Sequence, residues 1–230
     1  GGAGHSLRIA ERLHDTGRLI CIDRDDEALE NAKDRLKDVW QRVTPVKSDF
    51  RDIDKVLEGQ GLAGADGILF DLGVSSPQLD HAERGFSYMQ DAPLDMRMDR
   101  TSGFTAFDVV NGYERGELKR IIVDYGEERF AGPVAAAIVR ARETAPIRTT
   151  LELARIVASA IPSAKRERQH PAKRTFQAIR IAVNDELSAV EEGVRAAVDL
   201  LAPGGRVLVI TFHSLEDRIV KSLFRTLSNG

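Results

Sequence analysis

Cysteine is almost missing from this chain of 230 residues, and long hydrophobic runs are missing altogether. The single cysteine, Cys21, lies in the apolar run 19–22, so no internal disulfide can form. We expect it to be a small buried hydrophobe in a reducing, cytoplasmic setting. No apolar stretch is long enough to span a membrane, and none has the pattern of a signal peptide. The formal net charge of −3 gives no general sign of nucleic-acid binding, so any RNA contact must come from a local patch.

Strand and helix signals alternate in the first part of the chain. The predicted strands are residues 17–23, 43–46 and 68–71. The predicted helices between them are residues 25–39 and 53–57, and Asp25 is a suitable N-cap for the first of these. This alternation predicts a parallel sheet with helices on its faces.

The alternation stops in the middle of the chain, where no strand signal is found from about residue 103 to 169. The helices predicted there are residues 114–125, 127–144 and 150–160, with Thr150 as the cap of the last. We therefore predict a helical insertion, 103–169, within a main domain formed by residues 1–102 and 170–230.

The last part of the chain returns to the pattern of the first. Residues 175–201 are predicted to form one long helix, Pro203-Gly204-Gly205 a turn, and residues 206–212 a strand that rejoins the sheet. Both ends look cut, because the chain begins inside a glycine-rich loop with no strand before it. We expect the natural protein to be longer.

A possible ligand loop stands at the start, in the sequence Gly1-Gly2-Ala3-Gly4-His5-Ser6. Glycines let the backbone pass close to a ligand, and the helix that follows offers free N–H groups, although a plain turn would look the same. Asp23 ends the next strand, where an acid can bind ribose hydroxyls, and Asp25 is the better helix cap. Phe50 could flank an adenine or belong to the core. Asp49 beside it could bind the adenine amino group or be a solvated turn residue.

The most informative stretch is residues 66–99. It opens as a buried strand, Ile68-Leu69-Phe70, and Asp71 puts a carboxylate at the carboxyl end of that strand, where ligands bind in open α/β sheets. Two polar turns follow, at residues 75–78 and 93–99.

This stretch, together with residues 175–187 and 211–218, resembles the MraW/RsmH family, the S-adenosylmethionine-dependent methyltransferases that modify the N4 of a cytosine in small-subunit ribosomal RNA. The resemblance covers nearly the whole chain. It implies an α/β, Rossmann-like class I methyltransferase fold with a helical insertion domain, S-adenosyl-L-methionine as cofactor, and 16S ribosomal RNA of the small ribosomal subunit as partner. It also implies that the cofactor is contacted by Ala3, Gly4, His5, Asp23, Phe50, Asp71 and Gln78.

Methyl transfer to cytosine N4 needs groups that accept from its two N–H bonds and so stabilise the developing positive charge. The hypotheses for these groups are Asp71, the carbonyls near Ser75 and Ser76, and Asp95. His213 could orient the base or take the released proton. Each of these residues could instead be structural. His5 has no second ligand at a suitable spacing, so the sequence does not support a metal site.

A basic segment, residues 163–180, holds six basic residues against Glu167 alone. Such a patch suits phosphate contacts, and a solvated loop is the plain alternative. The predicted RNA-binding residues are Lys165, Arg166, Arg168, Lys173 and Arg174. Two other functions stay open from the sequence: an NAD-dependent reductase, and a non-catalytic RNA-binding or ribosome-assembly factor on a methyltransferase fold.

Overall fold

The computed structural model describes residues 2–162 and 169–228. The chain forms two compact units, the first made of Gly1–Ser76 and Glu186–Gly230 and the second of Pro77–Asp185. The second unit is wider on both sides than the predicted insertion, 103–169. The residues added to it at either end pack with its helices, as the contacts described below show.

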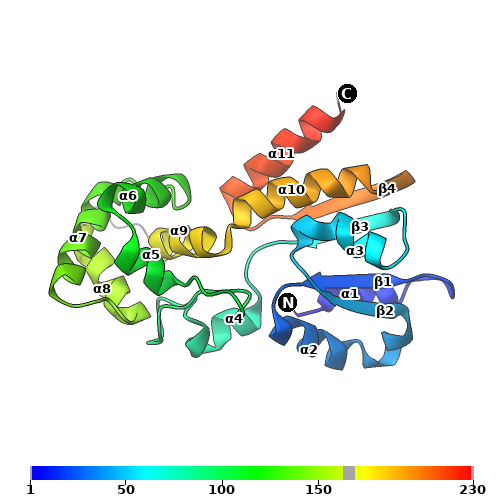
Figure 1. Cartoon of the computed structure of the whole chain (residues 1–230), viewed down its shortest axis with the longest axis horizontal. Helices are drawn as coiled ribbons and strands as arrows, with labels where there is room; N and C mark the ends of the chain where they lie inside the picture. The colour runs from blue at the N-terminus through cyan, green and yellow to red at the C-terminus, as the bar shows by residue number, and fades with distance from the viewer. Residues whose placement is uncertain (1, 163–168, 229–230) are drawn as a thin grey trace. The chain divides into compact units, whose positions relative to one another are not determined.

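The first half of unit 1 is built around two parallel strands (Figure 1). Its elements are α1 (Gly4–Ala10), β1 (Leu19–Asp23), α2 (Asp26–Arg35), η1 (Lys37–Arg42) and β2 (Val43–Lys47). Asp25 caps α2 as predicted, because its side chain accepts from the Glu27 N–H. A small apolar cluster that includes Ala10, Leu36 and Val43 joins α1 and α2 to the strands. Cys21 packs against this cluster, and burial raises the pKa of its thiol in spite of a hydrogen bond with Ser6.

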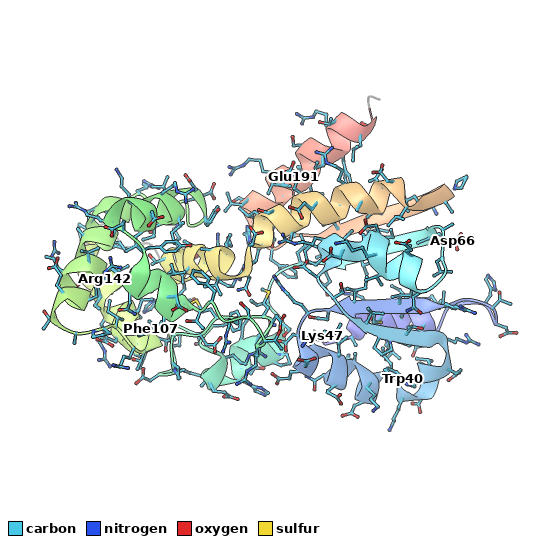
Figure 2. All side chains as sticks on the ribbon, in the orientation of Figure 1. Trp40, Lys47, Asp66, Phe107, Arg142 and Glu191 are labelled. Atoms are coloured by element: carbon cyan, nitrogen blue, oxygen red, sulfur yellow. The ribbon has the colours of Figure 1, made fainter. Side chains whose placement is uncertain are left out.

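The second half of unit 1 holds the other parallel pair. Its elements are η2 (Phe50–Asp52), α3 (Ile53–Gly59), β3 (Ala65–Asp71), α10 (Glu186–Asp199), β4 (Leu201–Ile210) and α11 (Ser214–Ser228). Asp71 lies opposite Ile210 in the register of β3 and β4. Helix α10 contacts α3, β4 and α11, and their apolar side chains form the larger core with Ile68, Phe70 and Val194 (Figure 1). In Figure 2, Asp66 marks the start of β3 and Glu191 lies on α10.

Both strand pairs are parallel, as the alternation of strands and helices predicted. They form two separate two-stranded sheets, β1-β2 and β3-β4, in the part of the chain that the structure describes. The predicted turn at Pro203-Gly204-Gly205 falls inside β4, where the register to β3 is irregular and Gly204 has a φ of 84°. The strand therefore starts earlier than predicted, at Leu201.

The prediction of one long helix over residues 175–201 is wrong. The structure has two helices, α9 (Lys173–Asn184) and α10, separated by Asp185. Asp185 has a left-handed φ of 48°, which ends α9, and the boundary between the two units falls directly after this residue. The local apolar spacing continues through Asp185, so the periodicity alone does not reveal the break.

Unit 2 is helical. Its elements are α4 (Ser76–Asp80), η3 (Ala82–Arg84), α5 (Ala106–Gly112), α6 (Arg115–Asp124), α7 (Ala131–Thr144), α8 (Thr150–Ala160) and α9. Arg142 of α7 donates to the carbonyls of Val110 at 2.7 Å and Tyr113 at 2.6 Å, and so satisfies the end of α5 (Figure 2). Across the described residues, no helix combines the length and the apolar character needed to cross a membrane.

The predicted cap of α8, Thr150, is wrong, because the structure has Thr149 in this position. The Thr149 hydroxyl accepts from the Glu152 N–H, whereas Thr150 is fully buried. The Thr150 hydroxyl donates to the Gln90 carbonyl at 2.6 Å and accepts from the Ala92 N–H at 3.0 Å. It therefore holds the start of α8 against the segment 90–92, a contact between residues about 60 positions apart that no local pattern encodes.

Candidate active site

The glycine-rich loop and the end of β3 meet in unit 1. His5 Nδ1 lies 3.0 Å from Asp71 Oδ2, and about half of each side chain is exposed. Ala3, which precedes α1, has a left-handed φ of 50°. This turn brings the start of α1, with its free N–H groups, to the carboxyl end of a parallel strand, which is where α/β proteins bind ligands. Ala3, Gly4, His5 and Asp71, four of the predicted cofactor residues, therefore belong to one place.

Asp23 is held at the end of β1 by its own loop. Its Oδ1 accepts from the Asp25 N–H at 2.9 Å, while Asp25 carries the cap of α2. The alternative reading of Asp23 as the helix cap is therefore excluded, since Asp25 fills that position. The carboxylate is oriented by the turn and partly exposed at a strand end.

Phe50 lies between the core and the surface. Its ring meets Phe70 edge-on, with the ring centroids 5.5 Å apart, and it is partly buried against the larger core. Gly193 of α10 lets it approach, because a Cβ there would lie 2.7 Å from the Phe50 ring. Both roles that the sequence left open are compatible with this position, because the ring packs against the core and is only partly buried.

Asp49, next to Phe50, is used by the fold. Its side chain caps η2 by accepting from the Arg51 N–H, and it lies 3.3 Å from Arg24 and 3.5 Å from the guanidinium of Arg51. A carboxylate with three such partners is a structural residue of this turn, so we do not assign it to adenine recognition.

Gln78 and Asp95 lie in unit 2. Gln78 is buried in α4. Asp95 forms a two-pronged ion pair with Arg97, at 2.9 Å from Nε to Oδ1 and 2.7 Å from Nη2 to Oδ2. Burial raises the pKa of Asp95, but the hydrogen bonds and charge of Arg97 outweigh it and leave this pKa below its ordinary value. Both carboxylate oxygens are thus engaged, which favours the structural alternative for this residue.

Two residues that the sequence did not single out, Arg84 and Asn184, hold the second polar turn, 93–99, in place. Buried Arg84 donates to the carbonyls of Arg97 and Met98, and Asn184 binds the Met98 N–H at 2.8 Å and the Met96 carbonyl at 2.7 Å. Met96 is fully buried with a left-handed φ of 60°. Such a conformation persists only when its surroundings impose it. Asn184 could have been found, since it lies in one of the three stretches that carry the family resemblance.

His213 and Glu216 lie at the N-terminus of α11. Glu216, which is 1% exposed, accepts from the backbone N–H groups of Phe212 at 2.8 Å and His213 at 3.3 Å. In return, the Glu216 N–H points to His213 Nδ1 at 3.4 Å. This exchange is the pattern of a capping box with histidine in the place of serine or threonine. It supports the structural alternative for His213, at the same sheet edge as Asp71.

Glu186 joins these two residues in a cluster whose possible ligand atoms all lie within 4.8 Å of one another. His213 Nε2 is 3.2 Å from Glu216 Oε1, but the two atoms do not form a hydrogen bond. The Glu216 N–H is directed at His213 Nδ1, and the N–H groups of Phe212 and His213 are directed at the Glu216 carboxylate, which are the contacts of a helix cap. We therefore assign the cluster to the start of α11.

Comparison with known proteins decides the family. The model of the MraW methylase family matches residues 1–230. The chain belongs to the MraW methylase family. Curated relatives of the chain are called "Ribosomal RNA small subunit methyltransferase H". The protein of Brevibacillus brevis is 56% identical over 231 residues, which cover 100% of this chain and 74% of that protein. The protein of a Paenibacillus species is 58% identical, over 97% of this chain and 73% of its own length. The protein of Symbiobacterium thermophilum is 56% identical, over 97% of this chain and 71% of its own length.

Membership in the MraW methylase family confirms the predicted resemblance and the α/β methyltransferase fold class. The predicted site residues are a different matter. The structure gathers Ala3, Gly4, His5 and Asp71, places Asp23 and Phe50 in the same unit, and places Gln78 and Asp95 in the other unit. Their roles in binding and catalysis stay predictions.

The predicted RNA-binding residues are only partly described. Lys165, Arg166 and Arg168 lie outside the described residues. Lys173 is exposed at the start of α9, and the Arg174 guanidinium donates to the Glu127 carbonyl at 2.9 Å. Lys173 therefore offers its charge to solvent, whereas Arg174 also ties α9 to the segment before α7.

Proposed function

We propose that this chain is an S-adenosylmethionine-dependent methyltransferase that methylates N4 of a cytidine in 16S ribosomal RNA of the small ribosomal subunit. The observation that carries the proposal is the identity of 56–58% with proteins named as small-subunit ribosomal RNA methyltransferases, over nearly the whole chain. The nucleoside, its N4 atom and the cofactor come from the predicted resemblance, and the geometry of unit 1 supports a cofactor site at the strand ends.

The residues of unit 1 fit an adenosyl group by their chemistry. A left-handed turn at Ala3 leads into free N–H groups, and Asp23 presents a carboxylate at the end of β1, as ribose hydroxyls require. Phe50 offers a partly exposed aromatic edge between the strands and α10. We assign cofactor binding in unit 1 to Ala3, Gly4, His5, Asp23, Phe50 and Asp71, and Gln78 of unit 2 stays a prediction from the resemblance.

When bound, S-adenosylmethionine supplies a methyl group that its sulfonium already activates. The protein then has to hold the acceptor nitrogen in line, which is mainly a matter of orientation. Asp71 accepts from the amino group and so stabilises the charge that develops on nitrogen. His5, 3.0 Å from Asp71 Oδ2, keeps this carboxylate oriented at the end of β3.

The direct test is mass mapping of small-subunit ribosomal RNA from cells that lack the protein. One cytidine should lose a methyl group on its base, and the purified full-length protein with S-adenosylmethionine should restore it on isolated small subunits. Intact methylation in the deleted cells, or failure of the purified protein to restore it, would contradict the proposal. RNA binding without methyl transfer would favour an assembly factor instead.

Cofactor binding has a separate test. Asp23→Ala should weaken the binding of S-adenosylmethionine by on the order of 1–3 kcal/mol, because the polar groups it pairs with lose their partner. Calorimetry on the full-length protein measures this change, with Asp26→Ala, an exposed carboxylate of the first turn of α2, as control. Equal affinities of the wild type and Asp23→Ala would remove Asp23 from the cofactor site.

A further inference from the structure

Phe212 is a large, exposed apolar side chain at the carboxyl end of the β3–β4 pair. It lies two residues after the end of β4 and is 68% exposed. Asp71 pairs in register with Ile210, and the Leu72 N–H donates to the Ile210 carbonyl at 3.2 Å. The chain after β3 and the chain after β4 therefore leave the sheet side by side, and Phe212 stands next to the segment that starts at Asp71.

The segment after Asp71 is shaped to receive the ring. Gly73 has a left-handed φ of 83°, and a Cβ on it would lie 3.3 Å from the ring of Phe212. The ring thus lies close to the glycine, and a side chain at this position would be strained by the left-handed φ and would press on the ring. The stretch 71–78 contains no aromatic residue of its own, and the ring of Phe212 lies against its Gly73.

The backbone of Phe212 is held in place by the side chain of Glu216. Its N–H donates to Glu216 Oε2 at 2.8 Å, and the same carboxylate accepts from the His213 N–H. Glu216 is buried at the start of α11, so the anchor is part of the fold. An exposed aromatic ring on such a fixed base loses little freedom when a flat ligand settles on it.

We propose that Phe212 is the surface on which the acceptor nucleobase stacks while its amino group is held at Asp71. This inference rests on the proposed function and adds the residue that positions the base. A base that is to be methylated must leave its own stack, and proteins commonly replace that stack with an aromatic side chain. Phe212 has the exposure, the anchoring and the place at the strand ends that this role needs.

Kinetics of the full-length protein on isolated small ribosomal subunits that lack the methyl group provide the test. Phe212→Ala should lower kcat/KM for the subunits by about 10-fold to 100-fold, the range expected for one base–aromatic stack. Phe212→Tyr and Phe212→Trp should keep kcat/KM within a few-fold of the wild type, because both retain a stacking face. The affinity for S-adenosylmethionine and the melting temperature should hardly change in any of the three.

Leu208→Ala is the matched control, since Leu208 is a 55% exposed apolar residue within β4, opposite Leu69 and four residues before Phe212. It should leave kcat/KM unchanged. Full activity of Phe212→Ala, or loss of activity in the tyrosine and tryptophan variants as well, would overturn the proposal. A clear drop in melting temperature for Phe212→Ala would identify a packed core residue and would also overturn it. If the wild type itself transfers no methyl group to the subunits, the proposed function fails first.

Discussion

Asp71 and His5 meet at the carboxyl end of β3 although 66 residues separate them in the chain. Each side chain is about half exposed, so neither is needed to fill the core. A carboxylate held by one hydrogen bond at a strand end keeps capacity to accept from a ligand, because each oxygen can accept two hydrogen bonds. This is the physical reason for placing the acceptor amino group at Asp71.

Asp71→Asn should fold almost normally but methylate about 100-fold more slowly or worse, since an amide places donors where the carboxylate only accepts. Single-turnover methyl transfer to unmethylated small subunits measures the effect. Asp66→Asn, an exposed residue of the same strand, is the control and should behave as the wild type. Near-normal turnover of Asp71→Asn would rule out its role as acceptor.

At the scale of elements, the packing of α10 on η2 decides where Phe50 lies. Gly193 is buried in α10, and a Cβ at this position would lie 2.7 Å from the Phe50 ring and 3.1 Å from its carbonyl oxygen. Ordinary helix propensity would favour alanine here, so the glycine reflects the close approach of the two elements.

Gly193→Ala should destabilise the protein by roughly 1–3 kcal/mol and weaken S-adenosylmethionine binding, because Phe50 must move. Gly132→Ala is the matched substitution in a helix where a Cβ would meet nothing within 4 Å. It should raise stability by a few tenths to about 1 kcal/mol. Denaturant unfolding and calorimetry measure both variants. A neutral or stabilising Gly193→Ala would show that Phe50 adapts without cost.

The turn at 93–99 gives unit 2 a pH dependence of known sign. The pKa of Asp95 in the folded protein is below its ordinary value, because the hydrogen bonds from Arg97 outweigh the effect of burial. Its contribution to stability is therefore complete above the unfolded-state pKa, about 3.9, and is lost as the pH falls through the lower folded-state pKa.

Asp95→Asn should lower the melting temperature at neutral pH and flatten its decline below about pH 4, since the group that takes up the proton is gone. Thermal melts from pH 7 to pH 2 measure both effects. Asp91→Asn, at an exposed carboxylate of the same segment, should follow the wild-type curve. The prediction fails if Asp95→Asn loses stability with falling pH as steeply as the wild type does.

For the whole molecule, the charge distribution matters more than the total. The net charge is −3, yet the segment 163–180 carries six basic residues against one acidic residue. Phosphate contacts made by such a segment would act on RNA of any sequence, and they would weaken as salt rises.

Lys173→Glu with Arg174→Glu should weaken binding to small-subunit ribosomal RNA and reduce its salt dependence, while S-adenosylmethionine affinity stays the same. Binding at two salt concentrations, with calorimetry for the cofactor, measures this. Lys119→Glu with Arg120→Glu reverses two exposed charges on α6 of the same unit and is the control. Equal losses in both double variants would indicate a general charge effect, and loss of cofactor binding would indicate misfolding, which the melting temperature checks.

Much of the fold could be predicted because its signals are local. The apolar runs of the strands, the capping of α2 by Asp25 and the carboxylates at the strand ends are each written within a few residues, and they survive in the structure. The three long stretches in their order were also enough to indicate the family, which the comparisons confirm.

What the sequence by itself determined is therefore the kind of fold, its strands and its family. Only the tertiary structure decided that the long helix breaks at Asp185, that Asp95 is taken by Arg97, and that Glu216 anchors Phe212 on Gly73. The first of these divides the two units, and the last places an aromatic ring beside Asp71. A helix break, an ion pair and an exposed ring depend on which surfaces face each other after folding, and local periodicity carries no information about that.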